Sequence, residues 1–184
     1  MVNQSLVALA VLAGGALLPT QATEIYGNLG VNYHDVSFDT GDAAFEAAQD
    51  DSDVGYHVAI GVRRPFGDSQ THWLGFQLEF DEILGDSMVA FRALDYQYAI
   101  DDRWRVGAFI GAASIDTGAS QTGYHLGGGV MYMNLLPQLD VGLDLRYGDR
   151  VARDRLFADD PQSDKSPDFF YDVLSTSLYA SWRF

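Results

Sequence analysis

The feature that most constrains the fold of this chain is an alternation of apolar and polar residues that recurs along most of its length. In HWLGFQLEFD (residues 72–81), from position 74 onward, Leu or Phe stands at every second position, with Gly, Gln, Glu or Asp between them. A period of two residues is typical of a β-strand, because successive side chains point to opposite faces of the sheet. The pattern predicts eight strands, at residues 24–34, 55–63, 72–81, 94–100, 104–112, 124–133, 139–148 and 173–184.

The first 22 residues have a different character. They carry no charged side chain, and residues 6–18 form an apolar run that is followed by Pro19 and then by the small residue Ala22. An apolar core too short to span a bilayer, then a helix breaker, then a small residue is the order of a secretory signal. We expect residues 1–22 to be a cleaved signal peptide and residues 23–184 to form one domain. A buried helix of a soluble protein is the alternative.

Each predicted strand has one apolar face and one face of glycine, amide and charge, and three features favour an outward apolar face. The connections around residues 65–68, 101–103 and 136–138 are short, whereas those after the first and seventh strands are long and polar. Aromatic residues gather at both ends of the apolar faces, as they do at membrane–water boundaries. The last strand, VLSTSLYASWRF, ends on an apolar face that no later segment covers. Lipid is the natural cover for these faces.

A sheet that lies in lipid must close on itself, because an open edge would leave backbone donors and acceptors without partners. Strands of ~9–11 tilted residues match the thickness of a bilayer. We therefore predict an all-β fold, an eight-stranded antiparallel up-and-down transmembrane β-barrel. If part of a long loop such as residues 43–48 paired with a neighbour, the barrel would have more strands.

Composition narrows the classes of function. The formal net charge is −15, and a nucleic-acid-binding protein needs Lys and Arg against the phosphates, so we expect no nucleic-acid partner. The chain has no cysteine, so it has no disulfide framework and no thiolate site. No cofactor is predicted.

The polar faces of the strands supply charged side chains to a barrel interior that is only wide enough for its own side chains. Opposite charges enclosed together must pair, because an unpaired buried charge is very costly. We expect an interior plug of ion pairs and hydrogen bonds; a narrow channel for ions or small polar solutes is the alternative, since inward glycines leave some room. The predicted interior residues are Arg63, Glu79, Asp95, Arg105, Asp144, Arg146 and Arg183.

Three inward histidines fall near one rim of the predicted barrel. His34, His57 and His125 lie at strand ends on the same side, and Asp81 joins them at that level. Three imidazoles and a carboxylate could bind a first-row metal, or supply the base of a lipid-modifying hydrolase or acyltransferase. The alternative is that each histidine completes the interior hydrogen-bond network.

The first long connection is acidic and contains no Lys or Arg. Its carboxylates are hard oxygen ligands that could hold Ca²⁺ or Mg²⁺ against anionic lipid phosphates, although no EF-hand spacing is present. The alternative is a solvated loop. The candidate ligands are Asp39, Asp42, Glu46, Asp50, Asp51 and Asp53.

On this pattern the chain resembles the small outer-membrane β-barrels typified by the transmembrane domain of OmpA and by OmpX. The most specific part of the resemblance is the alternation at the end of the chain. In this family such an ending implies a signal for periplasmic chaperones and for the barrel-assembly machinery, and here its residues are Leu174, Leu178, Trp182 and Phe184. The resemblance implies an integral protein of the bacterial outer membrane.

The function that we expect is structural and surface-interacting, without enzymatic activity. Lipopolysaccharide and outer-membrane lipid are the expected partners, through Ca²⁺ or Mg²⁺ at the acidic loops. A narrow channel is the first alternative, and a lipid-modifying enzyme or metal-binding rim at the inward histidines is the second.

Overall fold

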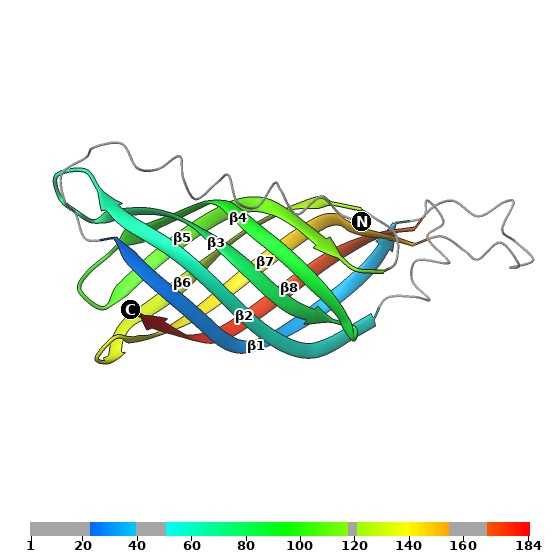
Figure 1. The fold of residues 1–184 in the computed structure, drawn as a ribbon, viewed down its shortest axis with the longest axis horizontal. Helices are drawn as coiled ribbons and strands as arrows, with labels where there is room; N and C mark the ends of the chain where they lie inside the picture. Colours follow the sequence, from blue (N-terminus) through cyan, green and yellow to red (C-terminus); the bar gives the residue numbers. More distant parts are fainter. Residues whose placement is uncertain (1–22, 40–50, 118–120, 155–168) are drawn as a thin grey trace, which may run out of the picture.

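The computed structural model describes residues 23–39, 51–117, 121–154 and 169–184. These residues form eight strands in one closed sheet, in which each strand pairs with its neighbours in the sequence (Figure 1). The predicted signal peptide, residues 1–22, and residues 43–48 lie outside the described residues. The strands are β1 (Glu24–Asp39), β2 (Asp51–Phe66), β3 (His72–Ile83), β4 (Asp86–Ala99), β5 (Trp104–Ile115), β6 (Gly123–Leu136), β7 (Leu139–Asp154) and β8 (Phe169–Arg183).

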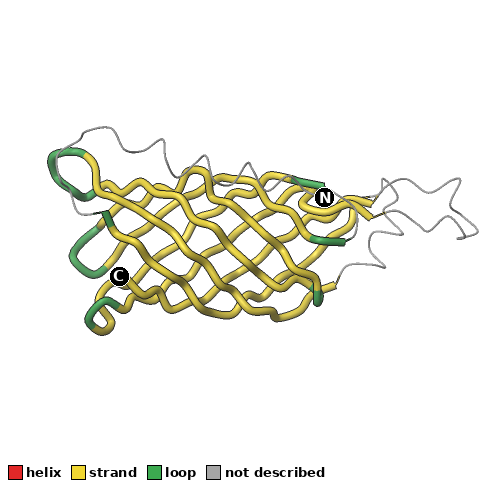
Figure 2. The backbone as a smooth tube through the Cα atoms, viewed as in Figure 1, coloured by secondary structure: helices red, strands yellow, loops and turns green. Residues whose placement is uncertain are grey.

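The barrel closes where β1 pairs with β8. This pairing is antiparallel and runs from Tyr26 opposite Arg183 to Asp39 opposite Phe170. The seven other neighbouring pairs are antiparallel too. Figure 2 shows the strands crossing the barrel axis at a tilt, as closure of a sheet requires. The predicted fold, an eight-stranded antiparallel up-and-down barrel, is confirmed.

The two ends of the barrel differ in their connections. At one end, which we call the turn end, lie Phe184 and the connections 67–71, 100–103 and 137–138 (Figure 1, left). The strand ends on either side of the other four connections lie at the opposite end, which we call the loop end. One of these connections is a two-residue turn, Leu84-Gly85, with φ angles of 51° and 85°. Two positive φ values are typical of the tight turn that joins hairpin strands.

The fourth strand is longer than the prediction of residues 94–100. β4 begins at Asp86, directly after the Leu84-Gly85 turn. The register of its pairing with β5 shifts between Arg92 and Leu94, so that Ala93 and Leu94 are both exposed. A β-bulge of this kind inserts one extra residue and breaks the two-residue period. The alternation therefore indicates a strand only from Leu94 onward, and the part of β4 before the bulge was not predicted.

The burial pattern is inverted relative to that of a water-soluble barrel. Large apolar side chains cover the outside, for example Leu29 at 67% exposure and Leu178 at 52%, whereas charged side chains such as Glu79 are enclosed. None of the described residues forms a helix that is long and apolar enough to cross a membrane. A continuous apolar outer surface is stable against lipid and costly against water. The described barrel therefore has the architecture of a membrane-spanning domain.

Candidate functional site

The middle of the lumen is filled by ion pairs that join opposite walls of the barrel. We call Glu79, Asp81, Arg92, Asp144 and Arg146 the central ionic cluster. Glu79 from β3 pairs with the Arg92 guanidinium of β4 and, at 2.9 Å, with Arg146 of β7. Arg146 also reaches Asp81 at 2.6 Å, and Arg92 reaches Asp144 at 2.7 Å. Each guanidinium therefore has two carboxylate partners, which is the arrangement that makes buried charge tolerable.

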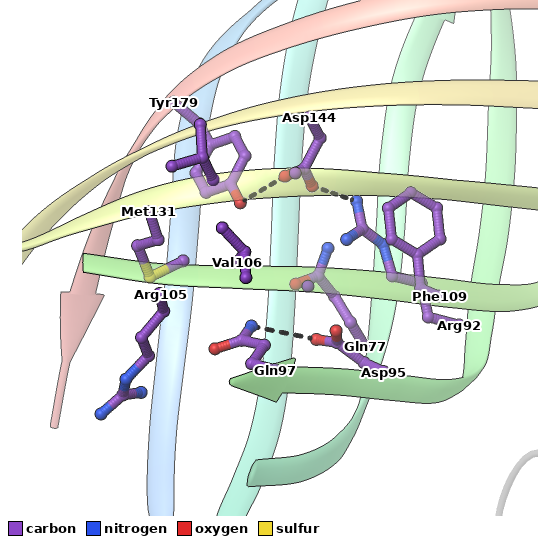
Figure 3. A pocket seen from close by; sticks show the side chains of 13 residues that line it. Gln77, Arg92, Asp95, Gln97, Arg105, Val106, Phe109, Met131, Asp144 and Tyr179 are labelled. Atoms are coloured by element: carbon purple, nitrogen blue, oxygen red, sulfur yellow. Dashed lines mark hydrogen bonds and ion pairs between the residues drawn. The ribbon is translucent and has the colours of Figure 1, made fainter. Parts of the chain in front are cut away.

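Neighbouring side chains pack around the central ionic cluster. The Arg92 guanidinium lies over the Phe109 ring, 3.5 Å from its centroid, and the Tyr179 hydroxyl donates to Asp144 at 3.1 Å (Figure 3). Gln77 donates to Glu79 at 2.6 Å. The cavity between these residues measures about 20 Å³. That is room for about one water molecule, so the middle of the lumen is a packed plug.

A second group of charges lies nearer the turn end, which we call the turn-end cluster: Glu24, Arg63, Arg105, Asp140 and Arg183. Glu24 Oε2 accepts from Arg63 Nε at 2.8 Å and from Arg105 Nη1 at 3.4 Å. Asp140 lies 3.6 Å from Arg63 and 3.0 Å from Arg183. Arg183 is the most exposed member of the predicted interior set, and it also donates to Asn134. The turn-end cluster therefore bounds the plug on the side of the turn end.

The lumen near the loop end is filled by apolar side chains that the sequence did not predict to be inside. We call this group the apolar cap, and each of its members is at most 2% exposed. They come from β1, β3, β4, β5, β7 and β8, so the cap reaches across the barrel. It therefore closes the lumen above the ions by packing alone. The members are Val36, Ile83, Met88, Ala90, Ala113, Ile115, Val151, Ala152 and Val173.

The structure brings together only two of the four residues predicted for the histidine rim. His57 Nδ1 lies 2.6 Å from Asp81 Oδ1. His34 Nε2 instead accepts from the Leu84 amide at 3.0 Å, and His125 Nε2 lies 3.3 Å from the Phe91 carbonyl. Within the described ranges, no three His, Cys, Asp or Glu side chains converge as metal ligands. The hypothesis of a three-histidine metal site therefore does not match the geometry of these side chains.

The predicted acidic-loop residues are only partly described. Asp42, Glu46 and Asp50 lie outside the described residues, as does the side chain of Asp39. Asp51 and Asp53 are exposed at the start of β2, where they accept the amides of Ser52 at 2.8 Å and Val54 at 2.7 Å. These contacts order the strand end and leave the carboxylates accessible to solvent.

The four residues of the predicted assembly signal share the outer face of the last strand and its end. Leu174, Leu178 and Trp182 on β8, and Phe184 just beyond it, all point to the outside, and Phe184 is the most exposed at 78%. The backbone amide of Phe184 donates to the Ile25 carbonyl at 3.0 Å. The end of the chain is therefore paired with β1 while its apolar face remains available.

Arg92 is the most important interior residue that the sequence analysis missed. It is 4% exposed and holds two carboxylates of the central ionic cluster. Val89 and Phe91 alternate with Ala90 and Arg92, and that short run was the available signal. Because the bulge at Ala93 ended the run, the segment was not assigned to a strand.

The fold and the lumen together define a class: a small outer-membrane-type β-barrel with an ionic interior. No protein-family profile matches the chain, and no curated protein matches it. Among solved structures, the attachment invasion locus protein Ail of Yersinia pestis, in complex with the heparin analogue sucrose octasulfate, is 11% identical. It aligns over 88% of this chain and 99% of its own, with a TM-score of 0.49.

Two further solved structures align over similar lengths. Neisserial surface protein A is 15% identical over 87% of this chain and 97% of its own, with a TM-score of 0.49. The outer membrane protein AlkL is 16% identical over 92% and 93%, with a TM-score of 0.45. With identities of 11–16% and TM-scores below 0.5, these similarities support no statement about activity. The assignment of the fold rests on the strand pairing itself.

Proposed function

We propose that this protein is an integral outer-membrane barrel with a closed lumen, and that its biological role is structural and surface-interacting. The observation that carries the proposal is the filling of the lumen. The central ionic cluster leaves a cavity of about 20 Å³, and the apolar cap closes the loop end. A barrel whose interior is packed in two layers contributes to the envelope as a rigid scaffold for what it presents at its loop end.

Lipopolysaccharide is the proposed surface partner. The acidic residues of the first long connection and the exposed Asp51 and Asp53 at its end supply oxygen ligands for Ca²⁺ or Mg²⁺, which would bridge to lipid phosphates. The basic residues Arg150 and Arg153 near the other long connection can contact phosphate directly. Barrel-assembly machinery is the proposed partner during biogenesis, through Leu174, Leu178, Trp182 and Phe184.

The surface role is tested by capture of purified lipopolysaccharide on residues 23–184 held in phospholipid nanodiscs, with Mg²⁺ and with EDTA. Empty nanodiscs are the control. We expect capture that exceeds the control and falls when EDTA removes the cation. Equal capture by empty and loaded nanodiscs in both buffers would show that the loop end does not bind this lipid.

The enzyme alternative has a separate test. His57 is fully buried beneath the apolar cap, and its Nε2 atom has no hydrogen-bond partner among the described residues. A buried imidazole cannot reach a lipid ester on the outer surface, so we expect the lipid A and phospholipid profile of cells carrying His57→Ala to equal that of wild type. A lipid species lost in the variant but retained in an equally abundant Tyr132→Phe control would establish an enzyme.

A further inference from the structure

The turn-end cluster contains more guanidinium groups than carboxylates. Among its described side chains, Arg63, Arg105 and Arg183 share the carboxylates of Glu24 and Asp140. Each carboxylate serves two cations. Three guanidinium groups therefore share two carboxylates in this largely enclosed group, and an anion from outside the chain would complete the set.

Of the three guanidinium groups, that of Arg105 has the weakest contact with a carboxylate. Its contact with Glu24 is 3.4 Å long and is made to Oε2, the oxygen that already accepts from Arg63 at 2.8 Å. No other hydrogen bond joins the Arg105 guanidinium to the part of the chain that the structure describes, although the residue is only 8% exposed. Most of its fork of N–H donors is therefore free to bind a ligand.

The free donors of Arg105 face an open space. Figure 3 shows the guanidinium directed away from Gln77, Asp95 and Asp144, which surround the small inner cavity. Arg105 also lines a larger cavity of about 390 Å³ at the turn end, which we call the turn-end vestibule. The side chain thus forms the floor that separates this vestibule from the packed plug.

The walls of the turn-end vestibule are partly apolar. Trp73, Ala99 and Met133 line it, and the Arg105 guanidinium lies over the Trp73 ring, 3.9 Å from its centroid. This stacking fixes the plane of the guanidinium. A planar guanidinium held by an aromatic ring presents two parallel N–H donors, the geometry that recognises a carboxylate.

Two acidic residues at the rim narrow the choice of anion. Asp101 and Asp102 also line the turn-end vestibule. Asp101 is partly satisfied by the amides of Arg103 at 2.7 Å and Trp104 at 2.8 Å, while Asp102 is exposed. Their charges oppose a multiply charged ligand such as phosphate more strongly than a monoanion.

We propose that the turn-end vestibule is a binding site for a small organic monocarboxylate that enters from the turn end of the barrel. Its carboxylate takes the free donors of Arg105, and its apolar body lies against Trp73 and Met133. The site is separate from the loop-end surface of the proposed function, and it needs no passage through the plug.

The test uses residues 23–184 in micelles and follows the indole N–H resonances of tryptophan by NMR, with Trp73→Phe assigning the Trp73 signal. Trp104 and Trp182 are exposed on the outer face and serve as internal references. Benzoate, its neutral isostere benzamide, and inorganic phosphate are the probes. We expect benzoate to shift the Trp73 resonance in a saturable way, with benzamide and phosphate each binding at least about tenfold more weakly.

Three results would overturn the proposal: no saturable shift with benzoate, equal affinity for benzamide, or tighter binding of phosphate. The titrations with benzoate, benzamide and phosphate are all made on wild-type protein, and the Trp73→Phe variant serves only to assign the signal. Arg105→Gln should weaken benzoate binding by about tenfold, which is the value of one charge-assisted contact. Arg64→Gln, which removes an exposed arginine near the same end, should leave it unchanged; equal loss in both variants would mean that net charge alone attracts benzoate.

Discussion

The two halves of the barrel lumen are closed by opposite kinds of side chain. In the middle, Arg92 and Arg146 bind carboxylates that project from facing strands. At the loop end, the apolar cap fills the same lumen with aliphatic side chains such as Val36 and Ile115. Ion pairs need defined partners, whereas the cap needs only shape and volume. The lumen of one barrel is therefore closed in two ways, which differ in their tolerance to mutation.

The largest expected effect comes from breaking the ionic half. Glu79→Ala removes one carboxylate partner from both Arg92 and Arg146 in a fully buried environment. We expect the free energy of unfolding to fall by about 3–5 kcal/mol, because each buried guanidinium loses one of its two ion pairs and the Gln77 amide loses its acceptor. Urea unfolding of the barrel in lipid vesicles measures the change. Glu82→Ala, on the outer face of the same strand, is the matched control, and equal midpoints for the two variants would refute an ion-paired interior.

A somewhat smaller effect is expected in the apolar half. Ile115→Ala leaves a void in the cap, where Ile115 is 2% exposed. We expect a loss of about 2–4 kcal/mol in the same unfolding assay, as for other buried large-to-small substitutions. Ile110→Ala on the outer face of β5, where the side chain is 48% exposed, should cost clearly less. A larger loss at Ile110 than at Ile115 would mean that the cap does not pack.

The smallest effect concerns the hydrogen bond that joins β8 to the ionic half. Tyr179→Phe removes the hydroxyl that donates to Asp144 at 3.1 Å. Because a hydrogen bond to a charged group contributes about 1.5–3 kcal/mol, we expect a loss near the lower end of that range. Tyr132→Phe loses only an exposed contact with Arg103 and should change the unfolding free energy by less than about 0.5 kcal/mol. Equal changes in both variants would remove Tyr179 from the network.

The inward direction of some lumen residues could be predicted from the sequence, and that of others could not. Glu79, Asp144 and Arg146 alternate with outward apolar residues, so their inward direction followed from the period of two. The members of the apolar cap carry no such contrast, because an apolar residue on an inward position looks like any other strand residue. Val151 and Ala152 are both buried next to a register shift between Gly148 and Ala152, where Arg150 has a φ of 51°. Irregular pairing of this kind leaves no periodic signal.

The pairing of the interior charges was also beyond the sequence. Which carboxylate meets which guanidinium depends on the tilt and stagger of the strands, because these decide which side chains face one another across the lumen. Arg146 of β7 reaches Glu79 and Asp81 of β3 only because the barrel closes with this stagger. For the same reason, His34, His57 and His125 contact different partners, although the sequence predicts that all three lie near the same rim.

The measurement that tests the closed lumen most directly is single-channel recording of residues 23–184 refolded into a planar lipid bilayer. Insertion is verified independently, by protection of the strands from added protease. With the lumen packed by the central ionic cluster and the apolar cap, we predict a bilayer that contains the protein and conducts no more than a protein-free one. Steady, reproducible conductance steps would contradict the account and would make the interior charges the lining of a channel.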